Sequence, residues 1–177
     1  MPDFDFQSRI IDIPDYPEPG VVFKDITPLF DDAEALAAVV DTIAGHFAGR
    51  GITKVAGAEA RGFLVGVPVA YKLGCGFVPA RKPGKLPRAT FSQSYELEYG
   101  TDTLEIHRDA LTPEDKVLIV DDLVATGGTA VATAKLVEQS GASVEGFSFI
   151  LELAFLHPRD VIAKEFGQEV FTLAQVE

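Results

Sequence analysis

The pattern of apolar residues predicts a helix near the start of the chain. Between residues 31 and 50, five apolar side chains recur at the spacing of an amphipathic helix: Leu36, Val39, Val40, Ile43 and Phe47. We expect Asp31 to cap this helix, with Glu34 three residues later as in a capping box, and Gly49 to end it.

The chain from residue 54 onward alternates short apolar runs with helical patterns. The expected strands are KVAGA (54–58), GFVPAR (76–81), KVLIV (116–120) and SVEGFSFILEL (143–153). Helices are expected over residues 62–74 and from Thr129 to Gln139, and a last short helix and strand after Val161. This alternation predicts a three-layer α/β domain with a central, mostly parallel sheet.

Two segments fit this alternation poorly. Residues 1–30 contain five prolines, and residues 91–109 alternate polar and apolar side chains around a Tyr-Gly turn, which indicates a hairpin. We expect a hood over about residues 1–30 and a lid over about residues 84–110. The prediction is a single domain, residues 1–177.

Composition narrows the possible functions. The chain is 47% hydrophobic and 24% charged, within the range of globular proteins. Its formal net charge of −12 argues against a nucleic acid or an anionic membrane as partner. The single cysteine, Cys75, cannot form a disulfide within the chain, and the acidic first residues do not resemble a secretory signal. We therefore expect a cytoplasmic protein.

The stretch IVDDLVATGGTA (119–130) carries the most specific pattern. Ionised carboxylates only accept hydrogen bonds, so Asp121 and Asp122 side by side suit the two vicinal hydroxyls of a ribose. Small residues then lead into a helix, whose first backbone N–H groups can bind a phosphate: Ala125, Thr126, Gly127, Gly128 and Thr129. Ligands of open α/β sheets bind at this edge, beyond the carboxyl ends of the strands. The stretch therefore suits a ribose 5-phosphate.

Three other interpretations of this stretch were open. It could be a strand-end turn in which an aspartate caps the next helix. It could be a Mg²⁺ site with acids at a strand end, although that leaves the Thr/Gly loop unexplained. A nucleoside triphosphate P-loop needs a lysine that is missing after Gly128.

The full stretch VLIVDDLVATGGT resembles the phosphoribosyl-pyrophosphate (PRPP) binding motif of the type I phosphoribosyltransferases. Four further blocks occur in the order seen in the adenine phosphoribosyltransferases of that family: GVVFKDITPLF, GAEARGFLVG, RKPGKLP and SYELEYGTDTLEIHRDAL. The resemblance covers nearly the whole chain. It implies transfer of the 5-phosphoribosyl group from PRPP to adenine, giving AMP and pyrophosphate. It also implies a homodimer, and Mg²⁺ carried by PRPP or pyrophosphate without direct protein ligands.

The resemblance also implies roles for individual residues. Asp121 and Asp122 would hold the ribose hydroxyls, and the loop 125–129 would hold the 5-phosphate. GAEARGF resembles the pyrophosphate loop, with backbone amides around Glu59 and Ala60 and often a non-proline cis peptide bond. Arg61 would lie between pyrophosphate and base, although for this residue taken alone a surface ion pair is the favoured interpretation.

The base and the pyrophosphate would be held by two further segments. Val22, Phe23 and Lys24 resemble the adenine-recognition segment, in which a backbone C=O and N–H match the N6 donor and N1 acceptor of adenine. A basic loop would bind pyrophosphate from its own or a neighbouring subunit: Arg81, Lys82 and Lys85. Taken alone, Val21, Val22 and Phe23 would be core residues, and the basic segment could be a solvated loop.

SYELEYG resembles the catalytic lid of the family. Glu98 would handle the proton of the attacking purine, and Tyr99 would help to close the lid over a cationic, oxocarbenium-like sugar. Two rivals remain: a phosphoribosyltransferase for hypoxanthine, xanthine or orotate, and a regulatory domain that senses PRPP without chemistry. His46, His107 and His157 have no metal-ligand spacing and are expected to be structural.

Overall fold

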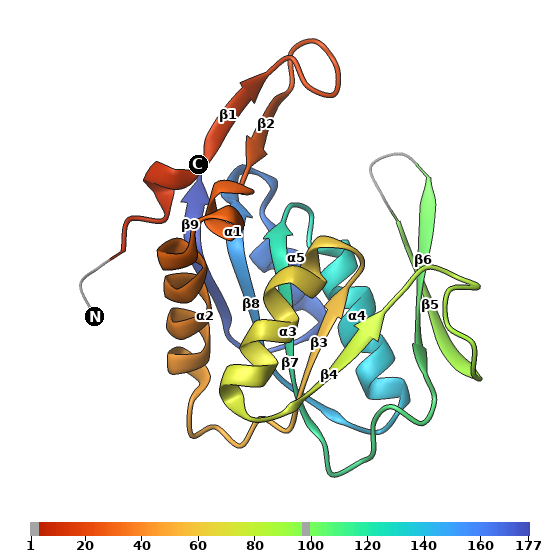
Figure 1. Ribbon diagram of the computed structural model, residues 1–177. Helices are drawn as coiled ribbons and strands as arrows, with labels where there is room; N and C mark the ends of the chain where they lie inside the picture. The colour runs from red at the N-terminus through yellow and green to blue at the C-terminus, as the bar shows by residue number, and fades with distance from the viewer. Residues whose placement is uncertain (1–3, 97–99) are drawn as a thin grey trace.

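A five-stranded sheet forms the centre of the protein (Figure 1), whose computed structural model describes residues 4–96 and 100–177. The strand order is β4–β3–β7–β8–β9, and every neighbouring pair is parallel. The strands are β3 (Lys54–Ala58), β4 (Gly76–Ala80), β7 (Lys116–Val124), β8 (Ser143–Leu153) and β9 (Val170–Val176). The predicted α/β class with a parallel sheet is confirmed.

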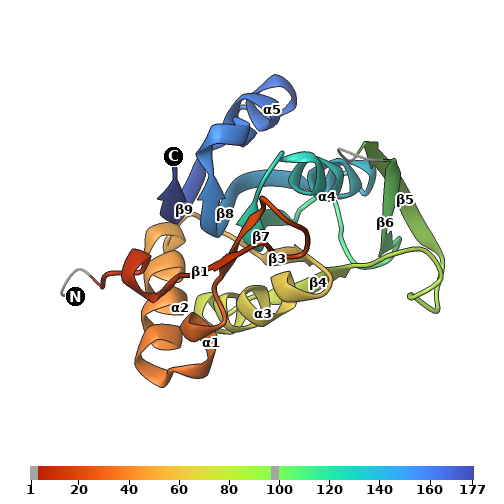
Figure 2. The same ribbon diagram turned by 90° about the horizontal axis from the view of Figure 1, so that it is seen from above.

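Helices cover both faces of the sheet (Figure 2). α1 (Pro28–Asp31), α2 (Ala33–Phe47) and α3 (Arg61–Leu73) lie on one face, and α4 (Gly128–Gln139) and α5 (Pro158–Glu165) on the other. The apolar run of β7 serves both, since Leu118 and Val120 pack toward α2 and α3 while Val117 and Ile119 pack toward α4. Successive side chains of a strand point to opposite faces, so a strand between two helical layers must be apolar throughout.

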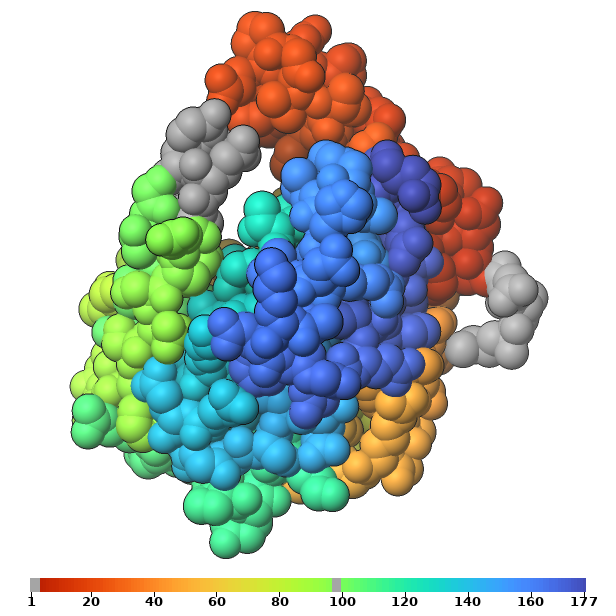
Figure 3. Space-filling view, turned by 180° about the vertical axis from the view of Figure 1, so that it is seen from behind, coloured from red at the N-terminus to blue at the C-terminus, as the bar shows by residue number. Residues whose placement is uncertain are grey.

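Two antiparallel hairpins project from this three-layer body. The hood consists of β1 (Ile11–Pro14) and β2 (Val22–Asp25), which follow the short helix η1 (Gln7–Arg9). The second hairpin joins β5 (Thr90–Glu96) to β6 (Thr101–His107). Seen from behind, the hood in orange lies above the body and this hairpin in green along one side of it (Figure 3). Both flank the edge where the parallel strands end, which is the expected ligand edge.

The β5–β6 hairpin is attached to the sheet through the end of β4. The Arg81 N–H donates to the Glu105 carbonyl at 2.9 Å, and the Glu105 N–H donates back to the Arg81 carbonyl at 2.7 Å. This antiparallel bridge joins the base of β6 to the residue that follows β4. The position of β6 is thereby tied to the central sheet.

Several element boundaries differ from the sequence-based expectation. Asp32, not Asp31, caps α2, with its Oδ1 accepting the Ala35 N–H at 2.8 Å, because Asp31 already ends α1. β7 continues to Val124 instead of ending at residue 120, since it stays paired with the long strand β8. α5 begins at Pro158, three residues before Val161, after the short helix η2 (Ala154–Leu156).

Among the helices of residues 4–96 and 100–177, none combines the length and the apolar character that crossing a membrane requires.

Candidate active site

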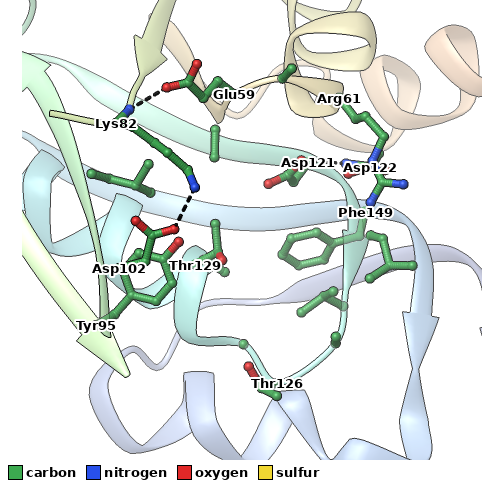
Figure 4. Close-up of a pocket in the computed structure, with 18 residues that line it drawn as sticks. Glu59, Arg61, Lys82, Tyr95, Asp102, Asp121, Asp122, Thr126, Thr129 and Phe149 are labelled. Atoms are coloured by element: carbon green, nitrogen blue, oxygen red, sulfur yellow. Dashed lines mark hydrogen bonds and ion pairs between the residues drawn. The ribbon is translucent and has the colours of Figure 1, made fainter. Parts of the chain in front are cut away.

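A cavity of about 600 Å³ opens at the carboxyl edge of the sheet (Figure 4). Its walls come from the loop after β3, Lys82 after β4, the β5–β6 hairpin, and the end of β7 with the loop that follows it. Ten of the residues predicted from sequence line it: Glu59, Ala60, Arg61, Lys82, Asp121, Asp122, Ala125, Thr126, Gly127 and Thr129. The volume is in the range of small-molecule sites.

The aspartate pair lies within β7 rather than beyond it. Asp122 is buried, and its Oδ2 lies 2.8 Å from Arg61 Nε in an ion pair. That oxygen nevertheless accepts no hydrogen bond from any residue that the structure describes. Oδ2 thus has a charge partner but a vacant hydrogen-bonding position, which a ligand hydroxyl would fill.

Asp121 packs tightly against the first turn of α3. A Cβ atom on Gly62 would lie 2.5 Å from Asp121 Oδ1, so only glycine leaves room for this carboxyl group. The same oxygen accepts the Asp122 N–H at 2.9 Å. Desolvation, together with the negative charge of Asp122, raises the pKa of Asp121 well above its usual range.

The loop after β7 lines the cavity and leads into α4. Gly127 precedes α4 with φ of +85°, a left-handed conformation that suits glycine. A Cβ atom there would also lie 3.0 Å from the Pro158 carbonyl oxygen. The N-cap residue Gly127 has no side chain to cap α4, and the Gly128 N–H makes only a long hydrogen bond, at 3.5 Å, to Thr126 Oγ1, so the start of the helix can still bind an anion.

The loop after β3 differs in part from the expectation. The Glu59–Ala60 peptide bond is cis, as the resemblance suggests. However, the Glu59 N–H donates to the Ala80 carbonyl at 2.9 Å and is therefore not free to bind pyrophosphate. The Glu59 carboxylate accepts hydrogen bonds from the Lys82 N–H and from Arg81 Nη2. Although desolvation opposes them, these donors hold the pKa of Glu59 below its usual range.

Other predicted residues lie outside the cavity wall. Arg81 is engaged with Glu59, at 3.0 Å, and neither Arg81 nor Lys85 lines the cavity. Gly128, the second glycine of the loop, is also not part of the lining. Glu98 and Tyr99 fall outside the described residues.

The predicted adenine segment forms strand β2 of the hood. Val22, Phe23 and Lys24 do not line the cavity. The Lys24 ammonium lies 2.7 Å from Asp12 on the facing strand, so its side chain is engaged within the hood. Any contact of this segment with a base would therefore be made at the upper margin of the site.

Sequence reasoning missed several residues that line the cavity, among them Tyr95, Asp102 and Phe149. The first two lie opposite one another on β5 and β6. Their alternation within a predicted hairpin placed them on one face, but nothing local showed that this face meets the cavity. Phe149 pairs with Asp121 in the β7–β8 register, which only the sheet topology reveals.

Comparison with known proteins identifies the family. The phosphoribosyl transferase domain family matches residues 24–166. An adenine phosphoribosyltransferase of Desulfitobacterium hafniense is 56% identical over 171 residues, covering 97% of this chain and 96% of that protein. The chain belongs to the adenine phosphoribosyltransferases. The expected fold and family are thus confirmed.

Solved structures of the family agree with this fold. The adenine phosphoribosyltransferase of Thermoanaerobacter pseudethanolicus aligns with a TM-score of 0.90 at 50% identity, over 97% of this chain and 98% of that one. The Giardia lamblia enzyme, solved in complex with 9-deazaadenine, aligns with a TM-score of 0.91 at 35% identity, over 98% and 97%. Coverage from end to end means that the hood and the β5–β6 hairpin lie within the aligned fold.

No group of three or more His, Cys, Asp or Glu residues placed to hold a metal ion occurs among residues 4–96 and 100–177. The cavity does offer carboxylate oxygens, which suit Mg²⁺ when a bound phosphate supplies further oxygen ligands. The donor set therefore fits a metal ion that arrives with a polyphosphate.

Asp121→Asn should stabilise the free protein at neutral pH by about 1 kcal/mol, because it removes a poorly solvated charge. Because the pKa of Asp121 is higher in the folded than in the unfolded protein, protonation of Asp121 favours the folded state. The gain is complete at a pH below the pKa of the unfolded protein. This contribution to stability is lost as the pH rises through the pKa of Asp121 in the folded protein. The variant should therefore gain most in Tm near pH 7 and nothing near pH 3. Thermal melts between these pH values test this.

The matched control is Asp122→Asn, which removes the partner of Arg61 and should not raise Tm. A lower Tm for Asp121→Asn at pH 7 would contradict the interpretation of Asp121 as a costly charge.

Proposed function

We propose that this protein transfers the 5-phosphoribosyl group from PRPP to adenine, forming AMP and pyrophosphate in purine salvage. One observation carries the proposal: Asp121, Asp122 and all of the loop 125–129 except Gly128 line one cavity in a chain of this family. Acceptors for a diol and amides for a phosphate lie a few residues apart on one strand and loop. That arrangement fits the span of a ribose 5-phosphate.

The ribose phosphate would be held at the end of β7. Asp122 Oδ2, which has no hydrogen-bond donor within the described chain, would accept one ribose hydroxyl, and Asp121 the other. The free N–H groups at the start of α4, with the hydroxyls of Thr126 and Thr129, would bind the 5-phosphate. Interactions in a partly enclosed cavity are stronger than in water, which favours tight positioning of the sugar.

The pyrophosphate would lie between the loop after β3 and Lys82. Arg61, which begins α3, and Lys82 supply positive charge at the cavity wall, and Ala60 supplies a backbone N–H. Arg81 and Lys85 would act at the margin. Mg²⁺ enters as part of the substrate, bound to PRPP, and leaves with pyrophosphate; when bound it screens the phosphate charge.

Adenine would bind under the hood. Val22 on β2 is 50% exposed, although a valine side chain gains by burial, so a purine ring would find an apolar surface there. The backbone around Val22 and Lys24 would pair with N6 and N1, and Arg61 would reach the ring from below. A 6-oxopurine presents the opposite polarity at position 6 and would leave polar groups unpaired. Such matching discriminates by roughly 10⁴-fold or more.

The chemical step needs a proton acceptor for the base. Purine N9 attacks C1′ of PRPP, the bond from C1′ to the pyrophosphate oxygen breaks, and the N9 proton must leave. From the resemblance, Glu98 takes that proton and Tyr99 helps to exclude water. Both assignments rest on the sequence motif SYELEYG.

A panel of bases tests the proposed activity. With Mg²⁺ and PRPP, adenine should yield AMP with a kcat/KM at least 10³-fold above that for hypoxanthine, xanthine or orotate. Chromatographic detection of the nucleotide and pyrophosphate release give two independent readouts. Turnover of hypoxanthine without adenine would assign another base. Binding of PRPP without pyrophosphate release for any base would indicate a sensor instead of an enzyme.

Glu98→Gln tests the role of the proton acceptor. Loss of general base catalysis typically lowers kcat by 10²–10⁴-fold, and the affinity for PRPP should change less than threefold. Glu96→Gln, two residues earlier on β5, is the matched control and should retain activity. Equal kcat values for the Glu98 variant and the wild type would reject the assignment.

We also propose that the protein forms a homodimer through α3. Three apolar side chains on this helix are exposed at positions i, i+3 and i+7: Leu64, Val67 and Tyr71, the last 87% exposed. Such a stripe on one helix face is typical of an interface. Because α3 begins at Arg61, a partner seated there would lie next to the cavity.

Val67→Glu should convert the dimer to a monomer, because it places a charge within the apolar stripe. Light scattering coupled to size-exclusion chromatography measures the mass directly. Ala37→Glu, at an exposed position of α2, is the matched control and should leave the dimer intact. A wild-type protein that is monomeric at micromolar concentration would refute the proposal.

A cytoplasmic location is part of the proposal. Its support is the composition, since a single cysteine in a 177-residue chain is typical of proteins from reducing compartments.

A further inference from the structure

An ion pair spans the cavity beside the predicted pyrophosphate position (Figure 4). The Lys82 ammonium lies 3.0 Å from Asp102 Oδ2. Lys82 follows β4, whereas Asp102 belongs to β6 of the hairpin, and both line the cavity. The ammonium group of Lys82, which is expected to bind pyrophosphate, is therefore already paired with the Asp102 carboxylate.

The two partners differ in their freedom to move. The Asp102 side chain is 22% exposed, and its Oδ1 accepts the Thr103 N–H at 2.8 Å, so its position is fixed on the strand. The Lys82 side chain is 59% exposed. Only its backbone is held, through the bond from its N–H to the Glu59 carboxylate. Lys82 can thus change partners while Asp102 stays in place.

Asp102 remains an anion at working pH. The Thr103 N–H and the Lys82 ammonium hold the pKa of the Asp102 carboxyl group below its usual range. A diphosphate that approaches Lys82 therefore meets a fixed negative charge. Asp102 opposes anion binding in two ways: it repels the diphosphate, and it pairs with the Lys82 ammonium that the diphosphate would bind.

We propose that Asp102 competes with the diphosphate group for the Lys82 ammonium and so limits how tightly pyrophosphate is held. The inference rests on the proposed function and adds to it a positioning residue that sets the release of one product. When PRPP binds, Lys82 turns from Asp102 to the diphosphate. When pyrophosphate leaves, Asp102 takes the ammonium back.

The size of the effect follows from the exposure of the pair. Ion pairs accessible to solvent change an equilibrium by a factor of about five at most. Competition of that size weakens pyrophosphate binding without preventing it, which suits a product that must dissociate in every cycle.

Asp102→Asn tests the proposal through the affinity for pyrophosphate with Mg²⁺, measured by calorimetry. The dissociation constant should fall about three- to fivefold, because the competitor is removed. Pyrophosphate should inhibit the forward reaction more strongly by the same factor, and the KM for PRPP should fall while kcat does not rise. Asp109→Asn is the matched control, because Asp109 lies beyond β6, pairs with Arg88 and does not line the cavity. It should leave the dissociation constant unchanged.

A double-mutant cycle shows whether Lys82 carries the effect. In a Lys82→Met background, Asp102→Asn should change the dissociation constant by less than twofold, since there is no ammonium to compete for. Asp102→Ser, which keeps a side-chain acceptor for the Thr103 N–H, serves as the second variant if the asparagine variant folds poorly.

The outcomes separate this inference from the proposed function. If the wild type binds neither pyrophosphate nor PRPP, the proposed function fails. If the wild type binds but Asp102→Asn leaves the affinity unchanged or weakens it, this inference alone is overturned. It is also overturned if, in the Lys82→Met background, Asp102→Asn still lowers the dissociation constant for pyrophosphate three- to fivefold.

Discussion

The aspartate pair inside β7 is the constraint on which the site depends. Two adjacent carboxylates in a strand covered by helices on both faces are unfavourable unless each has a partner. Asp122 has Arg61, and Asp121 has a backbone N–H and the space that Gly62 leaves open. The start of α3 is therefore shaped by the acids of a strand that lies more than fifty residues later in the chain. The carboxylates that line the cavity are therefore kept at an energetic cost of burial in the free protein.

The same constraint explains why β7 is longer than its apolar run. Pairing with β8 continues to Val124, so both carboxylates are fixed on a strand rather than on a flexible loop. Groups on rigid elements keep their geometry without the loss of conformational entropy that ordering a loop would require. The chain leaves the strand only where small residues can present backbone N–H groups to an anion. Acceptors and donors thus follow each other in a fixed order along one element.

The sequence predicted the layers of this fold more reliably than its contacts. Periodicity predicted β3, β7, β8 and the helices between them, because burial against a common core determines both the pattern and the structure. It failed where neighbours compete: Asp31 and Asp32 are equally suited to cap α2, and the separate short helix α1 decides between them. The motif at residues 119–130 predicted the two acids of β7 that line the cavity because they are adjacent in the chain. Asp102 and Tyr95 could not be found in this way, since the hairpin that carries them is placed at the cavity by tertiary contacts such as the Arg81–Glu105 bridge.

Charge in this protein is organised over short distances. A net charge of −12 would repel a polyphosphate, but salt screens charges beyond about 8–10 Å, so the local groups decide. Both cations that line the cavity have an acid beside them, Arg61 with Asp122 and Lys82 with Asp102, and the neighbouring Arg81 has Glu59. An anionic substrate therefore enters a neutralised site and must exchange partners with carboxylates instead of filling an open positive pocket. By the competition proposed for Asp102, pyrophosphate is held less tightly, and the carboxylate takes the Lys82 ammonium back when pyrophosphate leaves. An enzyme that must release two anionic products in every cycle gains more from that exchange than from tight binding.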